Sequence, residues 1–220
     1  LPELSTKRVL VAEYLEGVTL AAYLRARETN GEPAQDGGLV RRFDVSRFAR
    51  HVVRTFVTDA LKHGVFHADP HPANLLILDD SAVGYVDFGI TGALSEYSRR
   101  HLGAMTLAFV RGDLDAMHQS FMKLVSSTAH GNPDGFRAGL EALADQWYGN
   151  PRERRPRLSI TMVMMELLTL ARRTDLLPER EVVRFIRSAI VLDGLVRRFA
   201  PGFDFPGELE TACLALAETA

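Results

Sequence analysis

The sequence predicts a mostly α-helical domain of the α+β class with one short β-hairpin, and three features support this prediction. An apolar stripe runs through residues 44–63 at the spacing of a helix buried along one face. Two short apolar segments, residues 75–78 and 85–86, flank the turn residues 79–81. After residue 95 the pattern is helical almost throughout, with glycine and proline between the segments.

The composition suits one globular domain. The chain has 220 residues, a formal net charge of −2 and 46% hydrophobic residues, which is enough for a core. The near-neutral charge gives no reason to expect nucleic acid as a partner. Cys213 is the single cysteine, so a reducing, cytoplasmic compartment is expected. The longest apolar run, residues 158–170, is shorter than the roughly 18 residues of a membrane span and predicts a buried helix.

The first predicted elements are a strand and a short helix. Residues 8–14 (RVLVAEY) are rich in apolar and β-branched side chains and predict a strand. Gly17 breaks this strand, and Thr19 can cap a helix that extends to about Arg27. Residues 29–38 have the composition of a loop.

Residues 44–63 form the clearest predicted helix. Asp44 is its expected N-cap, and Gly64 stands where a C-terminal glycine is expected. The helix leads directly into the polar loop and the hairpin that follow it. Further helices are expected at residues 96–110, 114–125, 135–148, 159–173, 179–199 and 208–218.

Polar residues cluster around the predicted hairpin. The loop 67–74 ends in Asn74, directly before the first strand, and Asp87 follows the second strand. Because a hairpin returns its end close to its beginning, Asn74 and Asp87 should lie close together. An amide oxygen and a carboxylate suit a hard cation such as Mg²⁺, which also favours phosphate oxygens. Asp69 would then lie near the metal and face an incoming nucleophile.

The same residues follow the order of a protein-kinase active site, H-R-D-x-x-x-x-N and then D-F-G. Here the pattern reads HADPHPAN over residues 67–74 and DFG over residues 87–89. The sequence therefore predicts a protein-kinase-like C-lobe, with Asp69 as the catalytic aspartate. We expect His67 to orient the loop through hydrogen bonds rather than to act as a base.

Two departures from the kinase pattern are informative. Ala68 replaces the arginine that in kinases meets a phosphorylated activation loop, so no regulation of that kind is expected. No A-P-E follows Gly89, and a helix begins soon afterwards. The usual platform for a peptide substrate is therefore expected to be absent, which argues against an ordinary Ser/Thr kinase.

The segments GVFHADPHPANLL and VDFGITGAL resemble the UbiB family of atypical kinase-like proteins, also called the ADCK family. Residues 3–20 resemble that family's passage out of the N-lobe through the nucleotide hinge, and residues 177–205 resemble its C-terminal helices. The resemblance implies ATP and Mg²⁺ as cofactors and phosphoryl transfer or ATP hydrolysis as the activity. It also implies a link to isoprenoid-quinone (ubiquinone) biosynthesis or membrane lipid homeostasis.

The family's site residues carry over position by position. Asp69 matches the catalytic-loop aspartate, and Asn74 and Asp87 match the metal-binding residues. Glu13, Tyr14 and Leu15 match the hinge, whose backbone would meet adenine. The family's K-x-G-Q motif and its phosphate-pairing lysine do not occur in this sequence, so we expect the chain to be the C-lobe portion of a longer enzyme with the N-lobe largely absent.

On this basis the chain divides into three parts. Residues 1–16 are expected to end the N-lobe and form the hinge strand, residues 17–95 to form the C-lobe core, and residues 96–220 to form helices packed on the same domain. The resemblance implies ATP and an unidentified phosphoacceptor as partners, with lipid or quinone-pathway proteins as candidates, and a peripheral membrane contact.

Alternatives remain open at this point. The loop and the following aspartate also occur in small-molecule phosphotransferases of the aminoglycoside or choline kinase type, and a non-catalytic nucleotide-binding scaffold would keep the same residues. His67, Asp69 and His71 alternate in a way that a transition metal can use, although a surface position is favoured for His71. The basic run 152–157 (RERRPR) is interpreted as a solvated loop, with anionic lipid headgroups as the alternative ligand.

Overall fold

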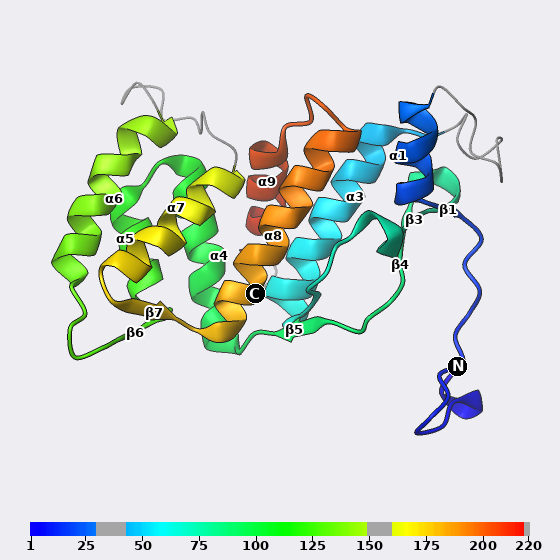
Figure 1. Ribbon diagram of the computed structural model, residues 1–220, viewed down its shortest axis with the longest axis horizontal. Coiled ribbons are helices and arrows are strands. Elements are labelled where there is room, and N and C mark those ends of the chain that lie inside the picture. The colour runs from blue at the N-terminus through cyan, green and yellow to red at the C-terminus, as the bar shows by residue number, and fades with distance from the viewer. Residues whose placement is uncertain (30–42, 149–159, 218–220) are drawn as a thin grey trace.

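The computed structural model describes residues 1–29, 43–148 and 160–217. Within these residues the protein is mostly α-helical with small two- and three-stranded sheets (Figure 1), as the sequence predicts. The helices are α1 (Leu20–Glu28), α3 (Val45–Thr58), α4 (Glu96–Arg111), α5 (Leu114–Met122), α6 (Pro133–Tyr148), α7 (Ile160–Arg173), α8 (Arg180–Phe199) and α9 (Phe205–Ala217).

The strands are short and all their pairings are antiparallel. The predicted hairpin is confirmed as β3 (Leu75–Ile77) and β4 (Val83–Tyr85), and β1 (Val18–Thr19) pairs with the free edge of β3. Two further pairs join β2 (Val65–His67) to β5 (Thr91–Ala93) and β6 (Val125–Ser127) to β7 (Leu176–Pro178).

The long helix before the site begins and ends where its capping residues predict. The Asp44 carboxylate accepts a hydrogen bond from the Arg47 amide at 2.9 Å, which satisfies a free N–H of the first turn. After α3 the helix continues as a π-helical turn (Asp59–His63), which the sequence did not reveal, and Gly64 ends it at φ 78°. This C-terminal glycine turns the chain directly into β2.

The part of the hydrophobic core nearest the polar loop lies where α3, β2 and α8 meet. The Phe185 ring of α8 stacks on Phe56 of α3 with centroids 5.1 Å apart, and it meets Phe66 of β2 edge-on at 5.5 Å. The side of α3 that carries the apolar stripe is buried at Phe48, Ala49, Val52, Val53, Phe56 and Val57. In Figure 1, α8 (orange) and α3 (cyan) run side by side. This part of the core therefore supports both helices that adjoin the polar loop.

An ion-pair cluster fastens α9 to α3. Glu208 of α9 is paired with Arg50 at 3.3 Å and also with Arg54, and its side chain is only 12% exposed. Both arginines of α3 therefore contact the same carboxylate of α9. The C-terminal helix is therefore part of the same packed body as the helix that leads into the site.

The predicted strand at residues 8–14 is wrong. Residues 5–17 contain no helix or strand, and Leu10 and Tyr14 are 85% and 87% exposed. Figure 1 shows this segment extending away from the helical body. A strand is stable only when its N–H and C=O groups have a partner strand, and among the described residues none lies beside this segment.

Other boundaries are closer to the predictions. The Thr19 hydroxyl accepts a hydrogen bond from the Ala22 amide at 3.1 Å, so the predicted cap of α1 is confirmed. Helix α5 was predicted to extend to residue 125, but it ends at Met122 because the strand β6 begins at Val125. Residues 30–38 and the basic run 152–157 lie outside the described residues. The division of the chain at residues 16 and 95 stays a prediction.

In the part of the chain that the structure describes, no helix combines the length and apolar character needed to cross a membrane.

The packing of Gly92 generates a stability prediction. A Cβ added at Gly92 would lie 2.2 Å from the ring of Phe66, which is buried between Phe56 and Phe185. Gly92→Ala should therefore lower the free energy of unfolding by about 1–3 kcal/mol through overpacking, measured by urea denaturation at unchanged m-value.

The matched control is Gly194→Ala in α8. Gly194 is exposed and a Cβ there meets nothing within 4 Å, so alanine should raise the free energy of unfolding by about 0.5–1 kcal/mol through helix propensity. Equal effects of the two substitutions would contradict the packing described for Gly92.

Candidate active site

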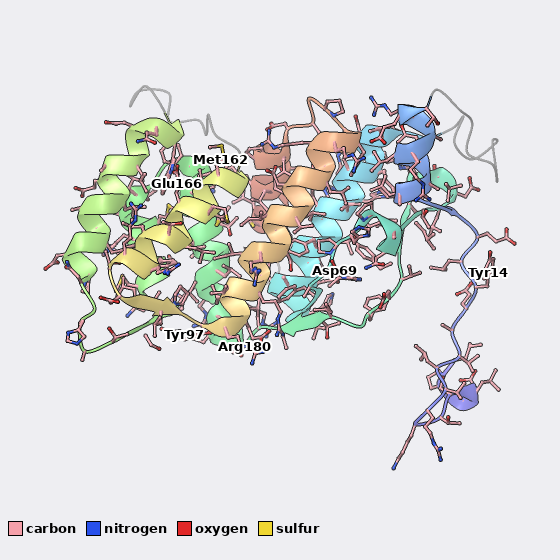
Figure 2. All side chains as sticks on the ribbon, in the orientation of Figure 1. Tyr14, Asp69, Tyr97, Met162, Glu166 and Arg180 are labelled. Atoms are coloured by element: carbon pink, nitrogen blue, oxygen red, sulfur yellow. The ribbon has the colours of Figure 1, made fainter. Side chains whose placement is uncertain are left out.

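The predicted catalytic loop lies between two paired strands. It follows β2, and the D-F-G segment runs into β5, which returns to pair with β2 so that His67 stands opposite Thr91. The amide of Ala68 continues this pairing and donates to the carbonyl of Ile90 at 3.0 Å. The segments before Asp69 and after Asp87 are thus joined along their backbones. Figure 2 shows Asp69 in the middle of the molecule, beside α8.

The buried imidazole of His67 ties the loop together. Its Nδ1 lies 3.1 Å from the amide nitrogen of Asp69, and its Nε2 lies 3.2 Å from the carbonyl oxygen of Val86. Because an amide only donates and a carbonyl only accepts, Nδ1 must carry the lone pair and Nε2 the hydrogen. The ring is therefore a neutral bridge between Asp69, the predicted catalytic residue, and the residue before Asp87.

Asn74 is oriented by its own hydrogen bonds. Its Nδ2 donates to the backbone carbonyl of Asp69 at 3.2 Å, and its backbone carbonyl accepts from the amide of Val86 at 3.0 Å. Since the amide nitrogen is engaged, Oδ1 is the atom left to accept a ligand. The hairpin brings Asn74 next to the residue that precedes Asp87, as the sequence predicts.

Asp87 has an unusual backbone. Its φ is 59°, in the left-handed region, and its Oδ1 accepts a hydrogen bond from the Gly89 amide at 3.2 Å. This conformation is uncommon for residues other than glycine, although aspartate tolerates it better than most. Strained backbone of this kind persists where the surroundings hold it and is frequent at functional sites.

The donor set suits a cation that also binds phosphate. The side chains of Asp69 and Asp87 are exposed and Asn74 is half-buried, so ligands can reach all three. Among residues 1–29, 43–148 and 160–217 no three His, Cys, Asp or Glu side chains group closely enough to hold a metal by themselves. A site with one carboxylate and one amide oxygen fits Mg²⁺ completed by water and phosphate oxygens.

The geometry disfavours the zinc alternative. Both nitrogens of His67 are occupied by backbone groups, so a metal at His67 would have to break one of these hydrogen bonds. The Nδ1 of His71 accepts from the amide of Ala73 at 3.2 Å, and His71 is exposed, as expected for a loop-surface residue.

Two titratable groups have shifted pKa values, Tyr85 at the end of β4 and Asp59 in the π-helical turn. Burial raises the pKa of Tyr85 strongly, and the nearby charge of Asp59 raises it further. Burial also raises the pKa of Asp59, while the charge of His63 lowers it. The hydroxyl of Tyr85 points toward the carbonyl of Val52 at 3.4 Å. Tyr85 therefore stays a neutral hydrogen-bond donor that joins the end of β4 to α3.

The predicted hinge residues are not brought to the site. Glu13 and Tyr14 are exposed on the irregular segment before β1, and Figure 2 shows Tyr14 far from Asp69. Leu15 is half-buried and packs near Gly84 of β4, where an added Cβ would lie 3.1 Å from its Cδ1. The adenine contact assigned to these residues stays a prediction.

Three contacts from α8 to the region of the candidate site were not predicted. The hydroxyl of Ser188 donates to the carbonyl of Ala68, the guanidinium of Arg184 donates to the carbonyl of Thr91, and the Glu181 carboxylate accepts from an amide of β5. The available sequence signal was the polar residue Ser188 among the apolar residues on the buried side of a predicted helix.

A kinase-like catalytic loop, a D-F-G segment joined to it by a hairpin, and a mostly helical lobe define the class as a protein-kinase-like catalytic lobe. The sequence matches the family of the ABC1 atypical kinase-like domain over residues 1–121. The chain belongs to this family, as the resemblance to the UbiB and ADCK proteins indicates.

Three relatives illustrate the similarity. A probable protein kinase UbiB of Shewanella woodyi is 26% identical over 209 residues, which are 92% of this chain and 35% of that protein. An uncharacterized protein in the hydrogenase 1 5′ region of Clostridium pasteurianum is 22% identical over 199 residues, 90% of this chain and 34% of that protein. An uncharacterized protein of Synechocystis is 33% identical over 118 residues, 54% of this chain and 16% of that protein. The chain thus spans about a third of the length of the first two relatives.

The hydrogen bonds predict opposite tautomers for two histidines. His67 should carry its hydrogen on Nε2, whereas His51, whose Nδ1 lies 3.2 Å from the Ser81 carbonyl, should carry it on Nδ1. Long-range ¹H–¹⁵N spectra of the imidazole rings distinguish the two forms at neutral pH.

Assignment of the two signals uses His51→Gln, which removes one of them. An Nδ1–H tautomer at His67 would contradict the bridge between Asp69 and Val86.

Proposed function

We propose that this domain binds ATP with Mg²⁺ and carries out phosphoryl transfer or ATP hydrolysis at Asp69. Membership in the atypical kinase-like family supports the proposal. The observation that carries it is the hydrogen-bonded set around the loop, in which Asn74 Nδ2 binds the Asp69 carbonyl and the Val86 amide binds the Asn74 carbonyl. This set leaves one amide oxygen and two carboxylates open to a ligand.

Each residue then has a defined task. Asn74 and Asp87 would hold Mg²⁺, which neutralises charge on the phosphates when it is bound. Asp69 would accept a hydrogen bond from the attacking hydroxyl or water and orient it. His67 would keep the backbone of Asp69 in register with Asp87. In this class of reaction, positioning and charge neutralisation supply most of the rate enhancement.

The biological setting is proposed from the relatives alone. The Shewanella relatives bear the name UbiB, and we propose the same link to ubiquinone biosynthesis or membrane lipid homeostasis for this chain. The acceptor would be a lipid or a protein of the quinone pathway, and contact with a membrane surface would be peripheral. Since the chain spans about a third of these relatives, their remaining two thirds would supply any further substrate contacts.

Nucleotide binding is tested by thermal unfolding with ATP, with and without Mg²⁺. A ligand that binds only the folded state stabilises it by about 2.7 kcal/mol at a hundredfold excess over Kd, so the melting temperature should rise only when Mg²⁺ is present. Asp87→Asn should remove this rise because it removes the metal-binding charge. Asparagine tolerates the left-handed backbone that Asp87 adopts, so the fold should persist.

Asp80→Asn is the matched control. Asp80 also has a left-handed backbone, with φ 56°, but its carboxylate pairs with Arg47 on the surface. This variant should keep the Mg²⁺-dependent rise. If the wild type shows no rise, or if the two variants behave alike, Asp87 does not hold a nucleotide-bound metal in this chain.

Catalysis is tested separately with Asp69→Asn. The substitution keeps the loop's backbone hydrogen bonds but removes the carboxylate, so ATP turnover should fall by at least about 100-fold while the Mg²⁺-dependent thermal shift remains. Phosphate release and isothermal titration with ATP measure the two properties. Turnover at the wild-type rate would exclude Asp69 as the catalytic residue.

The same pair of measurements separates the two alternatives. A nucleotide-binding scaffold would show the Mg²⁺-dependent shift in the wild type without turnover above that of Asp69→Asn. A small-molecule phosphotransferase would show turnover that depends on a soluble acceptor such as choline or an aminoglycoside.

A further inference from the structure

Helix α8 lies against the catalytic loop and the segment that follows D-F-G. The first half of α8 and the residue before the helix make hydrogen bonds to three separate elements around the candidate site. Ser188 reaches the loop after β2, Arg184 and Glu181 reach β5, and Glu179 just before the helix reaches the start of α4. A single rigid helix therefore contacts the backbone on both sides of the candidate site.

The contact of Ser188 is buried. Ser188 is 2% exposed, and its hydroxyl lies 3.1 Å from the carbonyl of Ala68 and 3.0 Å from the carbonyl of Arg184 in its own helix. Ala68 is the residue immediately before Asp69. The hydroxyl shares its one hydrogen between these two carbonyls. Because a partly buried carbonyl without a donor costs free energy, the contact helps to hold this backbone position of the loop.

Arg184 and Glu181 make the second contact. The Arg184 guanidinium donates to the carbonyl of Thr91 at 3.2 Å and pairs with Glu181 at 3.1 Å. Glu181 in turn accepts from the amide of Ala93 at 3.3 Å. These bonds occupy backbone groups of β5 that β2 does not use, so β5 is held between a strand and a helix.

The other end of α8 is anchored as well. The carbonyl of Phe199 accepts a hydrogen bond from Arg27 of α1 at 3.0 Å, and Arg198 pairs with Glu28. Figure 1 shows α8 running from β5 at one end to the neighbourhood of α1 at the other. Helix α1 directly follows β1, which pairs with β3 of the hairpin. One end of α8 is therefore bonded to the loop and to β5, and the other end to α1, which is continuous with the strand that pairs with the hairpin.

We propose that α8 is a permanent brace of the active site, and that Ser188 and Arg184 are positioning residues that hold the catalytic loop and β5 in the reactive arrangement. The effect on catalysis rests on the function proposed above, whereas the structural role of α8 in holding the loop and β5 does not. Because residue 68 is alanine, the loop has no arginine that could hold the segment after D-F-G. Arg184 of α8 holds this segment instead. Since Glu181 already neutralises Arg184, this contact needs no phosphate.

The test combines amide hydrogen exchange with ATP turnover on the full chain. Ser188→Ala should raise the exchange rates of the Ala68 and Asp69 amides by about 10-fold, because one buried hydrogen bond no longer opposes local opening. Arg184→Gln should do the same for the amides of β5. Both variants should lower kcat by about 10- to 100-fold, the cost of a displaced catalytic group, with KM for ATP changed less than about threefold.

Matched controls separate positioning from charge and from general loss of stability. Arg187 lies one turn along α8 from Arg184 and is exposed, and within the described residues the structure records no ion pair or hydrogen bond for it. Arg187→Gln therefore removes the same charge as Arg184→Gln without removing a recorded contact. Thr106→Val removes a buried hydroxyl that donates to the carbonyl of Leu102 within α4. Neither control should change exchange in the loop or in β5.

Each outcome decides the proposal. Unchanged exchange in both Ser188→Ala and Arg184→Gln overturns the brace, and Arg184→Gln remains informative if Ser188→Ala fails to fold because the Arg184 side chain is 32% exposed. Faster exchange with unchanged kcat overturns the positioning role. If the wild type neither binds Mg²⁺ with ATP nor turns over, the proposed function fails, and the exchange rates alone decide whether α8 braces the loop.

Discussion

The candidate site depends on the imidazole of His67. One ring nitrogen holds the amide of Asp69 and the other holds the carbonyl of Val86, so a single buried side chain fixes the distance between the two halves of the site. No other side chain type offers one acceptor and one donor at opposite ends of a small rigid ring. The position of Asn74, which bonds both the Asp69 carbonyl and the Val86 amide, then follows from the same two backbone segments.

Three successive sets of contacts hold the elements around this bridge in place. The strand pair β2–β5 closes the loop, the Phe56, Phe66 and Phe185 cluster joins that pair to α3 and α8, and Glu208 fastens α9 to the outer side of α3. The helices that follow D-F-G are therefore part of the structural support of the site. In a kinase with a peptide platform, the segment after D-F-G is free to rearrange, whereas here β5 is bonded on both of its edges.

Sequence patterns predict the helices well, and they predict strand pairing only for the hairpin, where a short turn joins the two strands. The 3.6-residue apolar stripe and the caps Asp44 and Gly64 are local signals, and α3 begins where they indicate. The order and spacing of Asp69, Asn74 and Asp87 around the hairpin indicated the candidate site, and their roles stay a prediction. The segment 8–14 has the composition of a strand but no partner among the described residues, and β5 has a partner that no local signal reveals. Strand formation depends on contacts distant in the sequence, as does the contact of Ser188 with the loop, which spans 120 positions.

The residues proposed to act on substrate are exposed, and the residues that position Asp69 are buried. Asp69 and Asp87, which carry the proposed chemistry, are exposed, whereas His67 and Ser188 are 6% and 2% exposed. A group that meets substrate must be accessible and gains little stability from its surroundings, while a group that positions it must have few alternative conformations. Substitutions at the exposed aspartates should then leave folding nearly intact, because no buried partner is lost. Substitutions at the buried positioning residues change stability and geometry together, so only a measurement of local exchange separates these two effects.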